Sequence, residues 1–140
     1  MKVSFKLCIL LIIPLLINCL DNAGDGNCNG VACTEIFSYL TVKVVDSQSQ
    51  PVALDSYKVV LTANGSDITP DFIDNDILSG EPGTYIVFSD NYADEYQNKT
   101  TVIRFTGFID TEEVVSSEFT VGADCCHVMM ITDNTTITIN

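Results

Sequence analysis

The chain has 140 residues, of which 19 are acidic and six are lysine or arginine, giving a formal net charge of −13 at pH 7. Such an anionic surface repels nucleic-acid phosphates and acidic lipid headgroups, so the composition argues against a nucleic-acid partner. Proteins, glycans and cations stay open as partner classes. The length suits one domain with a substantial hydrophobic core.

The first 18 residues have the pattern of an export signal. Lys2 and Lys6 give a positively charged start, an apolar run covers residues 7–17, and a polar stretch begins directly after it. The run falls short of the ~20 apolar residues that a transmembrane helix requires. We therefore expect residues 1–18 to be a signal peptide that is removed from the mature chain.

The end of this signal, Leu16-Ile17-Asn18-Cys19, resembles a bacterial lipoprotein signal. The resemblance implies that Cys19 receives a diacylglycerol thioether and becomes the first residue of the mature chain. It also implies a location in the bacterial cell envelope, with the outer membrane as the expected site of the lipid anchor. The alternative is ordinary secretion with cleavage near Ala23, but that cleavage site would place acidic Asp21 where a small residue is preferred.

Removal of the signal divides the remaining chain into a tether and a body. Loss of Lys2 and Lys6 leaves four basic residues against all 19 acidic ones, a formal charge of −15. Residues 19–34 form a lipidated polar tether, rich in Gly, Asn and Asp, that contains Cys28 and Cys33. Residues 35–140 form the folded domain.

Alternating apolar and polar residues predict β-strands throughout the body. Turn signals separate the runs, among them the stretch from Ser47 to Pro51, Asn64-Gly65 and Glu81-Pro82-Gly83. No helical stripe is present, and a loop is expected from Ile68 to Gly80. The fold class is therefore all-β, a single antiparallel β-sandwich of about seven strands, expected near residues 36–46, 57–61, 85–88, 101–109, 114–121, 126–131 and 135–139.

One stretch carries a family resemblance. The sequence from Val44 to Val52, followed by Gly83-Thr84-Tyr85, resembles carboxypeptidase-regulatory-like and related transthyretin-like domains, in which a Gly stands where this chain has Ser49. The resemblance implies an Ig-like or transthyretin-like sandwich that acts as a non-catalytic module. Independently of it, Asp46 is expected to accept hydrogen bonds from the turn backbone, and Pro51 to preset the entry to the next strand. The chain also resembles small envelope lipoproteins that end in Gly-Ala-Asp-Cys-Cys-His-Val, as residues 122–128 read here.

Four cysteines remain once Cys8 leaves with the signal and Cys19 is lipidated. An even number in an exported chain indicates disulfides, and four cysteines allow three pairings. A Cys28–Cys33 bond would leave Cys125 and Cys126 in a strained vicinal ring, so we expect two bridges between the two pairs. The first would stabilise the fold by about 4–5 kcal/mol in the chain-entropy model. On a strand the adjacent cysteines would point to opposite faces, and the bridges would clamp the tether to the sandwich.

A metal site is the alternative use of these residues. Thiolates, an imidazole and thioethers are ligands for zinc or Cu(I). The spacing suits no common zinc knuckle, however, and a strand would divide the ligands between two faces. We therefore predict no metal site for the set Cys28, Cys33, Cys125, Cys126, His127, Met129 and Met130, and expect His127 to be a strand histidine hydrogen-bonded near the disulfides.

The loop acids offer a second cation hypothesis. The sequence around Asp21 and Asp25 imitates the start of an EF-hand, but Ala23 and Ala32 stand where ligands belong, so that motif fails. Two other groups could hold calcium, although solvated acids are the expected outcome. These groups are Asp71, Asp74 and Asp76, and Asp90, Asp94 and Glu95.

Catalytic motifs are absent from the sequence: it has one histidine, no Gly-x-Ser-x-Gly and no phosphate-binding glycine loop. A carboxylate-based hydrolase is the remaining enzymatic alternative. We predict instead a membrane-anchored, non-catalytic binding or accessory module without a cofactor, with a protein or glycan as ligand. Binding predicts an open strand edge or an exposed aromatic patch, formed by Tyr92, Tyr96 or Phe108.

Overall fold

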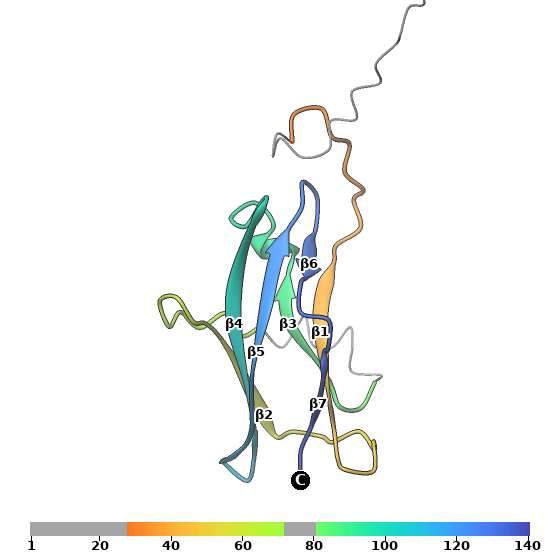
Figure 1. Ribbon diagram of the computed structural model, residues 1–140, viewed down its shortest axis with the longest axis vertical. Coiled ribbons are helices and arrows are strands. Elements are labelled where there is room, and N and C mark those ends of the chain that lie inside the picture. Colours follow the sequence, from red (N-terminus) through yellow and green to blue (C-terminus); the bar gives the residue numbers. More distant parts are fainter. Residues whose placement is uncertain (1–27, 72–80) are drawn as a thin grey trace, which may run out of the picture.

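The computed structural model describes residues 28–71 and 81–140, and in these ranges the protein is all-β, as predicted. The predicted signal, Cys19 and the first part of the tether lie outside the described residues. A single 3-10 turn, η1 (Asp90–Tyr92), interrupts the strands (Figure 1). The strands are β1 (Tyr39–Val45), β2 (Ser56–Leu61), β3 (Thr84–Ser89), β4 (Lys99–Ile109), β5 (Glu112–Ala123), β6 (Val128–Met130) and β7 (Thr136–Thr138).

The strands form two sheets. One has the order β3-β1-β7 and the other the order β2-β4-β5-β6. All pairs are antiparallel except β1 and β7, which run parallel with Lys43 opposite Thr136. The prediction of an entirely antiparallel fold is therefore wrong for this pair. After β6 the chain crosses from one sheet to the other and enters beside β1 in the same direction, a connection that strand periodicity alone does not specify.

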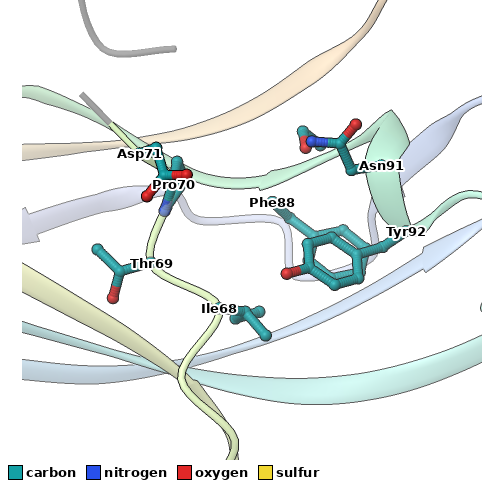
Figure 2. Close-up of a pocket in the computed structure, with 8 residues that line it drawn as sticks. Ile68, Thr69, Pro70, Asp71, Phe88, Asn91 and Tyr92 are labelled. Carbon is teal, nitrogen blue, oxygen red and sulfur yellow. The ribbon is translucent and has the colours of Figure 1, made fainter. Parts of the chain in front are cut away.

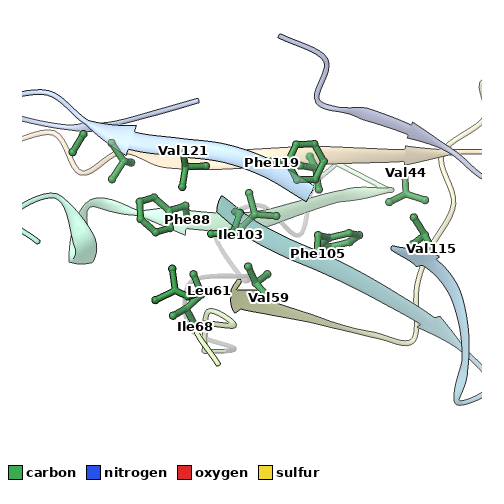
Figure 3. Close-up of a cluster of buried hydrophobic side chains, with 14 residues drawn as sticks. Val44, Val59, Leu61, Ile68, Phe88, Ile103, Phe105, Val115, Phe119 and Val121 are labelled. Atoms are coloured by element: carbon green, nitrogen blue, oxygen red, sulfur yellow. The ribbon is translucent and has the colours of Figure 1, made fainter. Parts of the chain in front are cut away.

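Apolar side chains from both sheets meet in one core (Figure 3). Val42 and Val44 of β1 face Ile103 and Phe105 of β4, and all four side chains are fully buried. Burial of a side chain of this size stabilises the fold by about 1.5–3 kcal/mol. The alternation that predicted the strands is thus the alternation between the core and the solvent, and it gives the two sheets a sandwich-like arrangement.

The Asn64-Gly65 turn reverses the chain after β2, as the sequence predicts. The amide of Gly65 donates to the carbonyl of Leu61 at 2.8 Å, and the amide of Leu61 donates to the carbonyl of Ser66 at 2.9 Å. Gly65 has a φ of +74°, a conformation that favours glycine. Within the sheet, however, the strand that pairs with β2 is β4.

The turn after β1 is organised by Asp46. Its Oδ1 accepts hydrogen bonds from the amides of Gln48 and Gln50, both at 2.8 Å, which confirms the predicted role of the aspartate. Ser49 has a φ of +62°, so the residue that stands in place of the expected glycine adopts a left-handed conformation. The side chain of one residue therefore fixes the whole turn.

Tyr85 connects β3 to the stretch that precedes β2. Its hydroxyl donates to the carbonyl of Val52 at 2.9 Å and accepts from the amide of Leu54 at 2.7 Å. Burial raises the pKa of Tyr85, and the hydrogen bond from Leu54 opposes the increase. The tyrosine therefore stays a neutral donor and acceptor between two segments that share no strand pairing.

Candidate functional site

The turn between β5 and β6 carries two adjacent cysteines and the only histidine of the chain. Oδ1 of Asp124 accepts hydrogen bonds from the amides of Cys126 at 2.7 Å and His127 at 2.8 Å. The amide of Asp124 in turn donates to the carbonyl of His127 at 3.0 Å. The bonds from the His127 and Cys126 amides hold the pKa of the Asp124 carboxyl below its ordinary value, against the opposing effect of burial.

This turn replaces part of a predicted strand. The sequence predicts a strand over residues 126–131, whereas β6 begins at Val128. Cys125 and Cys126 therefore lie in the turn, and the prediction that their side chains point to opposite faces of a strand is wrong. Because the Asp124 side chain closes the turn tightly, both cysteines reach the same neighbouring stretch of chain, residues 28–38, which we name the N-terminal segment.

Two disulfides join the N-terminal segment to this turn. Cys28 pairs with Cys125 and Cys33 pairs with Cys126, each with 5.3 Å between the Cα atoms. The bonds connect residues 97 and 93 positions apart. The predicted bridges between the two cysteine pairs are therefore present, and the structure selects one of the two pairings that such bridges allow.

His127 adds a noncovalent link beside the second disulfide. Its Nδ1 lies 2.7 Å from Oδ2 of Asp90, and its Nε2 lies 2.9 Å from the hydroxyl of Thr34. An ionised carboxylate only accepts hydrogen bonds, so Nδ1 carries a proton and donates it. In the neutral ring Nε2 is then an acceptor, and the Thr34 hydroxyl donates to it. One imidazole thus connects the N-terminal segment to η1.

Both carboxylate oxygens of Asp90 accept hydrogen bonds from this region. Its Oδ2 also accepts from the amide of Ser38 at 2.8 Å, and its Oδ1 accepts from the amide of Val128 at 2.9 Å. Burial disfavours ionisation of this carboxyl, whose side chain is 10% exposed. The bonds from Val128, His127 and Ser38 outweigh burial and hold the pKa of Asp90 below its ordinary value.

Together these groups form what we name the clamp, a set of contacts that ties the N-terminal segment to the body. The disulfides and the hydrogen bonds join these stretches at different residues, so the link is distributed over several contacts. The clamp comprises Cys28, Cys33, Thr34 and Ser38 on the N-terminal segment, and Asp90, Cys125, Cys126, His127 and Val128 on the body.

Thr34, His127 and Asp90 also have the order of nucleophile, base and orienting acid in triad hydrolases. Acyl transfer further requires a cleft for the substrate and donors aimed at the developing oxyanion. A cavity of about 110 Å³ lies beside β3 and η1, but its lining includes none of these three side chains (Figure 2). In the structure these three side chains link the N-terminal segment, the turn between β5 and β6, and η1.

The residues weighed for metal binding have other partners or lie apart. All four cysteines of the clamp are in disulfides, so they supply no thiolates. Within residues 28–71 and 81–140, no three His, Cys, Asp or Glu side chains come together as a metal site. Asp74 and Asp76 lie outside the described residues, and Asp90 is engaged by His127 and two amides.

The three aromatic residues predicted as an exposed binding patch are half-buried. The ring of Tyr92 stacks on Phe88 with 5.0 Å between centroids, and Tyr96 meets the same ring edge-on at 5.6 Å. Burial raises the pKa of both tyrosines. Tyr92 and Tyr96 pack against the core, so the prediction of an exposed patch from these residues and Phe108 is wrong.

Sequence reasoning missed Thr34 and the partnership between Asp90 and His127. It placed Asp90 among loop acids and described His127 only as hydrogen-bonded near the disulfides. Thr34 and His127 are 93 residues apart, and no local motif marks either as a partner of the other. The available signal was the cysteine pairing, because a Cys33–Cys126 bond brings the residue after each cysteine into the same place.

Comparisons with protein families, with curated proteins and with solved structures give no match. The part of the chain that the structure describes contains no helix long and apolar enough to cross a membrane. The function of the clamp is therefore inferred from its own geometry and from the sequence that precedes it.

Proposed function

We propose that the protein is a lipid-anchored lipoprotein of the bacterial cell envelope, attached to the outer membrane through Cys19. Its body is an Ig-like or transthyretin-like β-sandwich that serves as a binding or accessory module for a protein or glycan, without catalysis. The observation that carries this proposal is the clamp. It joins the segment that follows the anchor to the body by two covalent bonds.

The position of the clamp suits an anchored protein. A pull on the anchor reaches Cys28 before it reaches any strand, because Cys28 precedes β1 in the chain. The two disulfides pass that load to the turn between β5 and β6, in the larger of the two sheets. The clamp would therefore transmit a load applied at the anchor into the folded body.

The intact mass of the protein extracted from membranes tests the proposal. We expect the mass of residues 19–140 with added acyl groups, and four cysteine thiols that react with an alkylating reagent only after reduction. Cys19→Ala is the matched control: it should abolish acylation and release the protein from membranes while both disulfides stay intact. A wild-type mass without acyl groups would refute the lipoprotein assignment.

The ligand class is tested separately on the folded mature protein. Binding is measured on immobilised envelope glycans, and protein partners are sought by cross-linking in intact cells. We expect saturable binding to one glycan or one protein. The Cys19→Ala protein should bind it equally well, because the proposed ligand contacts the body. Absence of any saturable partner would reduce the proposal to an anchored structural protein.

A further inference from the structure

The exposed large apolar side chains of the described residues are confined to two short stretches. Three lie on the N-terminal segment and two lie on or directly after β6, and the most exposed, Ile36, has 72% of its surface accessible. Isolated exposed apolar residues are ordinary, but a cluster on neighbouring stretches indicates an interaction site. We name Val31, Ile36, Phe37, Met129 and Ile131 the apolar surface.

The two stretches run side by side. Cys33 bonds to Cys126, and the next residues, Thr34 and His127, are hydrogen-bonded to each other. Further along, the amides of Ser38 and Val128 donate to the same carboxylate. Ile36 and Phe37 therefore lie between contact points that hold this part of the segment next to the start of β6, and Figure 1 shows the segment passing beside that strand.

The two stretches that carry the apolar surface contribute no basic side chain of their own, and Lys99 lies on the adjoining strand β4, opposite Ala123. Residues 28–38 and 124–131 contain no lysine or arginine, and their acids are Glu35 and Asp124. The Asp124 carboxylate accepts hydrogen bonds from the amides of Cys126 and His127. Such a surface favours an uncharged or zwitterionic partner over an anionic one.

The sequence before the clamp limits how far this surface can lie from the lipid anchor. Cys28 follows Cys19 by nine residues, and nine extended residues span roughly 30 Å. A tether of this length keeps the apolar surface at high effective concentration beside the bilayer, so weak contacts suffice for docking. Exposed apolar and aromatic side chains, such as those of Ile36 and Phe37, are suited to the boundary between headgroups and acyl chains.

Resting on the proposed function, we infer that the apolar surface docks on the zwitterionic lipid surface that holds the anchor. The clamp then has a second consequence: it fixes Ile36 and Phe37 relative to the sandwich, so docking orients the body with the β4–β5 turn directed away from the membrane. In Figure 1 that turn lies at the opposite end of the molecule from the N-terminal segment.

A tryptophan probe tests the inference, because the chain contains no tryptophan. Acylated Phe37→Trp protein is reconstituted in phosphatidylcholine vesicles, with or without brominated acyl chains. We expect a blue-shifted emission and a decrease in intensity of about twofold with the brominated lipid. Glu112→Trp, exposed at the far end of the body, is the matched control and should show neither effect. Adding Ile36→Asp to Phe37→Trp should reduce the quenching while acylation and disulfides persist.

The outcomes separate this inference from the proposed function. Acylated protein whose position-37 indole is not quenched would overturn membrane docking and leave the lipoprotein proposal standing. An indole shielded only as protein concentration increases would indicate that a second copy covers the surface, which also overturns the inference. Protein without acyl groups by intact mass would overturn both.

Discussion

The two ends of β1 are each held by an aspartate, but in different ways. At the end of the strand, Asp46 binds the amides of residues two and four positions ahead. Before the strand, the clamp joins the N-terminal segment to residues more than 50 positions away in the sequence. The first device is complete within one turn, whereas the second requires three parts of the folded chain.

We therefore expect mutations in the Asp46 turn and in the clamp to change the stability of the protein by different amounts. Loss of a local turn leaves the two sheets and the core in place, since neighbouring strands still pair. Loss of the clamp frees the chain before β1 and removes the constraint that the disulfides impose on the unfolded state. The clamp should therefore dominate the global stability and the local protection of residues 28–38, and the Asp46 turn should affect both only slightly.

Removal of both disulfides has the largest expected effect. The double variant Cys125→Ser and Cys126→Ser should lower the free energy of unfolding by about 4–5 kcal/mol, because it opens a loop of nearly one hundred residues in the unfolded chain. Chemical denaturation monitored by circular dichroism gives the value. Wild-type protein in reductant should match the variant, and an unchanged free energy would contradict the role given to the clamp.

Asp90→Asn tests the polar half of the clamp with the disulfides retained. The amide loses the charge and one of the two acceptor oxygens that serve Val128, Ser38 and His127, so we expect a loss of about 2–3 kcal/mol. Hydrogen exchange at residues 34–38 should accelerate in the variant. Thr34→Val, which removes only the hydroxyl, is the graded control and should cost less than Asp90→Asn.

Strong acid should weaken the clamp, because its carboxylates accept hydrogen bonds only while they are ionised. The pKa values of Asp90 and Asp124 are lowered in the folded protein, so their contribution is present above the ordinary carboxyl value of 3.8. As the pH falls below that value and through the folded pKa values, both carboxyls are protonated and the stabilisation is lost. NMR shifts of the amides of Ser38 and Val128 should follow this titration, and in Asp90→Asn the Ser38 shift should no longer do so.

Ser49→Gly has the smallest expected effect and the opposite sign. Ser49 adopts a left-handed φ that costs a side-chain-bearing residue roughly 1 kcal/mol, while glycine loses more entropy on folding. We expect a net gain of about 0.5 kcal/mol by thermal denaturation. Ser49→Val should destabilise the turn, and stabilisation by valine would contradict the assigned backbone conformation.

The sequence is informative where partners are close along the chain. Alternation located all seven strands, and Asp46 and Asn64-Gly65 were predicted as turn residues because their hydrogen bonds are local. The parallel entry of β7 and the links of Asp90 to His127 and Ser38 depend on how distant elements pack, which periodicity does not encode. The cysteines were the exception, because exclusion of a vicinal bond restricted their partners to the opposite pair.

Aromatic side chains show a second limit. The binding hypothesis predicted Tyr92 and Tyr96 in an exposed patch, yet both rings pack against Phe88. The exposed apolar side chains instead include those of Ile36 and Phe37. The alternating pattern predicted these two residues at the start of a strand, whereas β1 begins at Tyr39. The clamp explains this reversal, since it holds residues 34–38 outside the sheet, directly before β1.

Peptide mapping of the membrane-extracted protein without reduction would determine the disulfide pairing of the clamp. We expect fragments in which the stretch containing Cys28 and Cys33 is joined to the stretch containing Cys125 and Cys126, with further cleavage assigning Cys28 to Cys125 and Cys33 to Cys126. Fragments in which each pair is closed on itself, or four thiols that are free before reduction, would contradict the clamp and leave the anchored segment without a covalent link to the body.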